Sequence, residues 1–100
     1  MANWNTYIVG FEIKRDDDYH SRYNSLMKLI NKVSFKWTEP TSFIAIHVDE
    51  TLSGLASRLY TKSEVNSTKD VLVVVDTSTD KAKYYGPLSR KPTKYIFDLI

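Results

Sequence analysis

The pattern of apolar and polar residues along the chain first predicts strands. Residues 6–14 carry apolar side chains on both strand faces, which is typical of a strand inside a sheet. Residues 43–48 and 71–75 repeat this double-sided pattern. Residues 34–38 alternate polar with aromatic residues, as a half-buried or edge strand does. Residues 82–86 form a short candidate strand that pairs back on the preceding one.

Two amphipathic helices are predicted between these strands. From Asp18, apolar residues recur at spacings of three and four for roughly four turns, and Arg22 falls on the polar side. The acidic run at residues 16–18 suits the helix N-cap and the positive end of the helix dipole. Residues 49–51 offer the next N-cap, and the second helix is expected over residues 52–61.

The order strand, helix, strand, strand, helix, strand predicts a ferredoxin-like α+β sandwich, with one antiparallel sheet and both helices on one face. We expect residues 1–86 to form this domain and residues 87–100 to form a tail that is first basic and then apolar. Because three strands are apolar on both sides, the face without helices needs a cover. A second subunit packed through the sheet face would supply one, and this predicts a homodimer. The alternative is that the tail folds over the same face.

Composition and length limit the function classes. A chain of 100 residues makes one domain with little stability to spare. The absence of cysteine excludes disulfides, thiolate zinc sites and cysteine nucleophiles. The first residues do not resemble a signal peptide and no apolar run is as long as a bilayer span, so we expect a cytoplasmic protein without a membrane partner. A net charge of +2 does not by itself predict a nucleic-acid partner.

Three stretches resemble, in order and spacing, the small SinR-like proteins: residues 6–13, 37–44 and 70–75. This family is grouped with the CRISPR-associated adaptation subunit and the VapD-type ribonucleases, and the resemblance covers roughly residues 6–86. It implies a ferredoxin-like homodimer whose first strand ends in an acid that faces its symmetry mate. It also implies metal-dependent nuclease activity in some members. Glu12 matches the position of that acid, where the family more often has aspartate.

Glu12 is therefore the candidate catalytic and metal-binding residue. In a dimer, one Glu12 from each chain could hold a divalent cation such as magnesium, which would activate water against a phosphodiester. The alternative is an ion pair with Lys14, Arg15 or a tail lysine. The extra methylene of glutamate favours this alternative, because catalytic geometry tolerates displacement poorly.

Basic residues near the C-terminus are interleaved with tyrosines. Phosphates take up such charges and exposed bases stack on aromatic rings, so this pattern predicts an RNA or DNA partner. The alternative is a solvated basic tail. Neither His20 nor His47 has a second histidine at ligand spacing, which favours a surface or packed histidine at each position. The candidate nucleic-acid contacts are Lys14, Arg15, Lys81, Lys83, Arg90, Lys91 and Lys94.

Together these expectations favour a small dimeric nucleic-acid-binding or scaffolding protein of the SinR-like group over an efficient enzyme. Two alternatives stay open. One is a metal-dependent endonuclease or endoribonuclease with Glu12 as a metal ligand. The other is a pure protein-interaction module of a mobile element or a defence locus.

Overall fold

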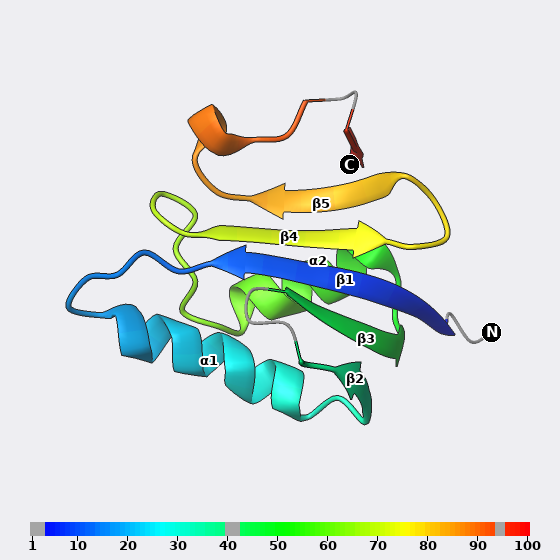
Figure 1. Cartoon of the computed structure of the whole chain (residues 1–100), viewed down its shortest axis with the longest axis horizontal. Coiled ribbons are helices and arrows are strands. Elements are labelled where there is room, and N and C mark those ends of the chain that lie inside the picture. Colours follow the sequence, from blue (N-terminus) through cyan, green and yellow to red (C-terminus); the bar gives the residue numbers. More distant parts are fainter. Residues whose placement is uncertain (1–3, 40–42, 94–95) are drawn as a thin grey trace.

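The computed structural model describes residues 4–39, 43–93 and 96–100. In these residues two α-helices accompany a six-stranded sheet with the strand order β2-β3-β1-β4-β5-β6 (Figure 1). The elements are β1 (Trp4–Glu12), α1 (Tyr19–Asn31), β2 (Phe35–Trp37), β3 (Phe43–Asp49), α2 (Leu52–Thr61), β4 (Val71–Asp76), β5 (Lys81–Tyr85), the 3-10 turn η1 (Leu88–Arg90) and β6 (Asp98–Leu99). The first six elements have the ferredoxin-like order, and the predicted α+β class is confirmed.

β1 lies inside the sheet, as its double-sided apolar pattern predicts. It pairs antiparallel with β3 on one side and with β4 on the other, so that Val9 lies between Ile44 and Val74. The predictions for β3 and β4 are also confirmed, because each has a strand on both sides. β2 is the edge strand that the alternation of polar and aromatic residues indicates. β1 begins at Trp4 and ends at Glu12, two residues earlier than the pattern predicts at each end.

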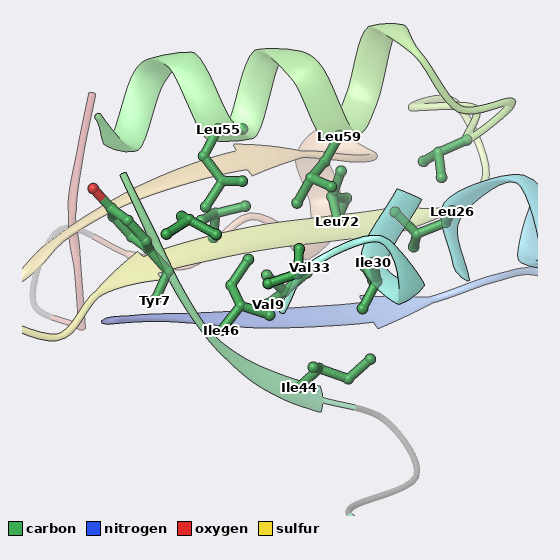
Figure 2. Close-up of a cluster of buried hydrophobic side chains, with 14 of the residues drawn as sticks. Tyr7, Val9, Leu26, Ile30, Val33, Ile44, Ile46, Leu55, Leu59 and Leu72 are labelled. Atoms are coloured by element: carbon green, nitrogen blue, oxygen red, sulfur yellow. The ribbon is translucent and has the colours of Figure 1, made fainter. Parts of the chain in front are cut away.

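The core lies between the two helices and one face of the sheet. Leu55 and Leu59 of α2 point toward Leu72 on β4, and α1 contributes Leu26 and Ile30 to the same buried cluster (Figure 2). All five side chains are completely buried. Burying a leucine or isoleucine contributes about 1.5–3 kcal/mol, so this cluster fixes both helices on one face. Neither helix in the described residues is long and apolar enough to cross a membrane.

The described part of the tail extends the sheet at its β5 edge. β6 pairs parallel with β5, and the amide of Ile100 donates to the carbonyl oxygen of Ala82 at 3.1 Å. The sheet is therefore mixed, which corrects the expectation of a wholly antiparallel sheet. The outer edge of β5 offers unpaired backbone groups, and β6 satisfies some of them. The tail thus runs beside β5 in Figure 1, and its Ile96 and Ile100 stay exposed.

Gly86 joins β5 to the tail where two groups leave no room for a side chain. A Cβ atom at this position would lie 2.6 Å from the Tyr84 hydroxyl oxygen and 3.1 Å from the Asp70 carbonyl oxygen. We expect Gly86→Ala to lower the free energy of unfolding by about 1–3 kcal/mol, as overpacking does. Chemical denaturation measures this change. The variant Tyr84→Ala removes the atoms nearest to that position. In this variant, Gly86→Ala should lower the free energy of unfolding by less than it does in the native protein. An equal loss of stability in both proteins would contradict the steric explanation.

Candidate functional site

Glu12 ends β1, and its exposed carboxylate forms a double hydrogen bond with Arg90. The Nη1 and Nη2 groups of Arg90 donate to Oε1 and Oε2 of Glu12, each at 2.9 Å. This hydrogen bonding and the positive charge of Arg90 lower the pKa of Glu12. Within one chain, Glu12 therefore forms an ion pair, as the alternative hypothesis predicted. Its partner is an arginine that follows β5, and not Lys14, Arg15 or a tail lysine.

The groups around Glu12 do not fit a magnesium ion within one chain. Magnesium prefers several oxygen ligands in near-octahedral geometry, whereas Arg90 holds both carboxylate oxygens of Glu12. In residues 4–39, 43–93 and 96–100, no three histidine, aspartate or glutamate side chains gather closely enough to hold a metal ion. Metal-dependent hydrolysis at Glu12 thus stays a prediction that needs a second chain and the release of Arg90.

The acidic run before α1 does not cap the helix through its side chains. Asp18 is the N-cap residue, but its backbone (φ −100°, ψ 10°) is not extended and its carboxylate makes no capping hydrogen bond. The helix therefore starts where the run predicts, directly after Asp18, but without the predicted side-chain cap. Thr51 shows the contrast, because its extended backbone (φ −76°, ψ 161°) lets Oγ1 accept from the amide of Gly54 at 3.1 Å.

Asp16 instead belongs to a buried ionic network centred on Arg22 and Asp70. Arg22 is only 4% exposed and Asp70 is completely buried. The Arg22 Nε donates to Asp70 Oδ2 at 2.8 Å, and its Nη1 donates to Asp16 Oδ1 at 2.9 Å. Lys69 Nζ holds the other oxygen of Asp16 at 2.8 Å. The network ties the start of α1 to the start of β4.

Every polar atom of the Asp70 carboxylate has a partner. Backbone amides of Lys14 and Asn66 donate to it at 2.9 and 3.0 Å, in addition to Arg22. Burial alone would raise the pKa of Asp70, but the hydrogen bonds from Arg22 and from these amides outweigh it and lower the pKa. A carboxylate so fully satisfied is a structural group, since no lone pair is left to take a proton from a substrate.

The position of Arg22 corrects the sequence prediction, which placed it on the polar side of α1. Arg22, Leu26 and Ile30 are spaced by four residues and are the buried residues of this helix. That spacing could have indicated that Arg22 lies on the buried face of α1, because residues at i, i+4 and i+8 share one face of a helix. Which acid would neutralise the arginine could not be predicted, since Asp70 lies 48 residues away in the chain.

Only some of the candidate nucleic-acid-binding residues lie close together in the structure. β1 and β5 both run antiparallel to β4, so Lys14 and Arg15 follow β1 at the same end of the sheet where Arg90 and Lys91 follow β5. Arg90 is paired with Glu12, and the Arg15 guanidinium lies 4.6 Å from the centre of the Tyr19 ring. Lys81 begins β5 at the opposite end, Lys83 lies between, and Lys94 falls outside the described residues.

The sheet face away from the helices carries an exposed aromatic patch on β1, β2 and β3. Trp4, Phe35 and Trp37 are between 52% and 60% exposed, and Phe43 is 37% exposed. His47 stacks on Trp4 with 5.4 Å between ring centres and shares a 2.9 Å hydrogen bond with the Thr6 hydroxyl. The aromatic patch is made of Trp4, Phe35, Trp37, Phe43 and His47. His47 is thus a packed surface histidine, and His20 is exposed beside the Tyr19 ring.

Apart from Thr6, the described rest of this uncovered face is mainly apolar, and its charged side chains lie where strands end. The register places Ile8 between Ala45 and Val75, and it places Gly10 between Phe43 and Val73. Strand alternation puts all of these positions on the face of the aromatic patch. Within the described strands, the charged residues of this face are Glu12 at the end of β1 and Asp49 at the end of β3. Sequence reasoning predicted an apolar face here but did not identify the aromatic patch.

A hollow of about 270 Å³ borders the aromatic patch, where Trp4, Phe35 and His47 meet the ends of the helices. Its charged lining includes Arg58 and Glu50, whose side chains are joined at 2.7 Å and 2.9 Å. Hydrogen bonding to Glu50 raises the pKa of Arg58. This pair neutralises itself and supplies neither a free base nor a free nucleophile to the hollow.

Comparison of the chain with protein-family models, with curated proteins and with solved structures gives no match. The membership in the SinR-like group that the sequence suggests therefore stays a prediction. Among the described residues, the aromatic patch brings four exposed aromatic side chains from three adjacent strands together on one face.

Proposed function

We propose that this chain is a non-enzymatic scaffold that works as a homodimer, with the uncovered face of its sheet as the subunit interface. The observation that carries the proposal is the aromatic patch on a mainly apolar face, whose charged side chains in the described strands lie at strand ends. Exposed apolar patches rimmed by polar residues mark interaction sites in soluble proteins. Interface centres are likewise rich in tryptophan and phenylalanine and poor in charge.

A second copy of the chain is the occupant that suits this face best. In a two-fold dimer the same patch meets itself, so a patch of one charge sign would repel its partner. Trp4, Phe35, Trp37 and Phe43 have no ionisable side chain, and the His47 ring stacks on Trp4. A patch built mainly of uncharged aromatic rings can therefore meet a second copy of itself.

The uncovered face is also large enough for a stable dimer. Figure 1 views the chain down its shortest axis and shows the strands of the sheet side by side; the chain as a whole extends 42 by 32 Å across this view. A standard interface takes about 800 Å² from each partner. The whole chain exposes 6186 Å², so such an interface would use only a small part of it. Covering the sheet would add apolar burial that a core of this size needs.

Sedimentation velocity tests the proposal directly. At micromolar concentration we expect a particle of twice the 11.6 kDa chain mass. We also expect the melting temperature to rise with protein concentration, because association stabilises the folded state by mass action. A monomer at these concentrations would overturn the proposed dimer.

Nucleic-acid binding is the second candidate function, and the charges at one end of the sheet favour it. Lys14, Arg15 and Lys91 are exposed there, beside the pair formed by Arg90 and Glu12. Two copies in a dimer would double this modest basic surface. Binding through phosphates should weaken as salt rises, and an affinity for RNA or DNA that salt leaves unchanged would count against it.

Replacement of Glu12 separates the scaffold from a nuclease. We expect neither the native protein nor Glu12→Ala to cleave RNA or DNA above background with magnesium, manganese or chelator, because Arg90 occupies the Glu12 carboxylate. Asp17→Ala is the matched control, since Asp17 is also an exposed acid. Magnesium-dependent cleavage that Glu12→Ala abolishes and Asp17→Ala retains would establish the nuclease instead.

A further inference from the structure

A groove of about 510 Å³ runs along α1 beside the end of α2, in the helix layer. Its volume lies in the range of small-ligand sites. Lys28 lines it from α1, and Lys32 and Lys62 line it from the cap residues that directly follow α1 and α2. The groove therefore brings three cations from two segments of the chain to one hollow, which we term the lysine groove. Leu29 and Lys32 also line the hollow that borders the aromatic patch, so the lysine groove lies next to that hollow on the helix side.

The three lysines of this groove have no anionic partner in the described part of the chain. None of them forms an ion pair or a side-chain hydrogen bond there. Lys28 and Lys32 are four residues apart on the same helix side, where like charges repel each other. An anion placed between them would remove this repulsion.

Among the neutral groups of the lysine groove, Asn24 contributes an amide that can donate to an anion. The two lining hydroxyl groups donate elsewhere, Ser21 to Glu64 Oε1 at 2.7 Å and Ser25 to the Arg22 carbonyl oxygen at 2.8 Å, so the three lysines and Asn24 are the donors that an anion would use. Glu64 is the single acid among the lining residues, so the groove keeps a net positive charge. No aromatic ring lines it among the described residues, which leaves no platform on which a base could stack.

We infer that the lysine groove binds a compact anion that carries several phosphates. Lysine ammonium groups bind phosphates as point charges, and neighbouring phosphates would engage Lys28, Lys32 and Lys62 together. Such phosphates occur both in free polyphosphate compounds and in the backbone of an oligonucleotide. Inorganic tripolyphosphate and a short single-stranded oligonucleotide serve as probes for these two sources.

The test compares the full chain with the triple variant Lys28→Gln, Lys32→Gln, Lys62→Gln by isothermal titration. We expect the triple variant to bind its probe at least about tenfold more weakly, since hydrogen bonds to charged groups are lost. For the oligonucleotide we also expect the slope of log affinity against log salt to shrink by about 2, for roughly three lost phosphate contacts. The control variant Lys28→Arg, Lys32→Arg, Lys62→Arg keeps three positive charges in the groove, so it should keep most of the affinity.

Each outcome of this test is decisive. Tripolyphosphate binding that the triple variant loses and the control keeps identifies a site for free polyphosphate compounds. Oligonucleotide binding with the same pattern, but without tripolyphosphate binding, identifies a site for a nucleic-acid backbone. The inference is overturned if neither probe binds, or if the control loses as much affinity as the triple variant. The particle mass of each variant, measured in parallel, keeps a failure of this site distinct from a failure of the proposed dimer.

Discussion

Replacing Asp70 by asparagine is expected to lower the free energy of unfolding by about 3–5 kcal/mol, the cost of removing one partner from a buried ion pair. Asp70 is completely buried, and the substitution would leave the nearly buried Arg22 without its main counter-charge. Domains of this size have about 5–15 kcal/mol of stability in total, so the variant should be largely unfolded at modest denaturant concentrations.

Chemical denaturation followed by circular dichroism measures this loss, with Asp17→Asn as the control. Asp17 belongs to the same acidic run but is exposed, so its replacement should change the free energy of unfolding by less than about 0.5 kcal/mol. Equal stability of the native protein and Asp70→Asn would show that the network contributes little.

The pH dependence of stability gives a second measurement on the same network. The folded pKa values of Asp70 and Asp16 lie below their ordinary value, which is about 3.9 for aspartate. For Asp16 the hydrogen bonds from Lys69 and Arg22 are the main cause. A lowered folded pKa means that the stabilisation is fully present above the unfolded pKa and is lost as pH falls through the folded value. We therefore expect stability to fall steeply below about pH 4, and less steeply in Asp70→Asn.

Replacing Trp37 by glutamate is expected to convert the proposed dimer into a monomer. In the proposed interface, a tryptophan of the aromatic patch is the type of residue whose loss costs at least about 2 kcal/mol of binding, or roughly 30-fold in Kd. The new carboxylate would also be buried in an apolar interface without a partner. Trp37 is 53% exposed in the single chain, so the fold itself should survive.

Sedimentation velocity over a range of concentrations measures the shift, and circular dichroism checks the fold. Phe43→Glu should act in the same direction, because Phe43 contacts Trp37 with 6.0 Å between ring centres. Ser53→Glu on α2 is the control, since it adds the same charge to an exposed position of the helix layer. If Trp37→Glu and Phe43→Glu both kept the native dissociation constant, the aromatic patch would not be the interface.

Most of the architecture could be predicted from local patterns. The apolar periods indicate where β1, α1, β3, α2 and β4 lie, because each element must bury a face that its own sequence defines. The cap at Thr51 could be predicted for the same local reason. The tail could not, since pairing of β6 with β5 depends on backbone hydrogen bonds that any sequence can make.

The candidate site was predicted less well, because it depends on contacts between residues far apart in the chain. Glu12 was identified as the acid at the end of β1, but its partner Arg90 lies 78 residues away. The lysine groove likewise joins α1 to the end of α2, and no local spacing of lysines indicates that they share a hollow. Long-range pairs of this kind have no periodic signature in a single sequence.

For this protein the sequence by itself determined the α+β class, the inner position of β1 and the apolar character of both sheet faces, because hydrophobic periodicity is a local property. Only the tertiary structure decided that Arg90 holds Glu12 and that Arg22 is buried against Asp70. It also decided that the aromatic patch stays uncovered by the described part of the tail. These features depend on which segments the fold brings together. The energy of an ion pair depends on the distance between its charges, and for residues far apart in the chain only the tertiary structure gives that distance.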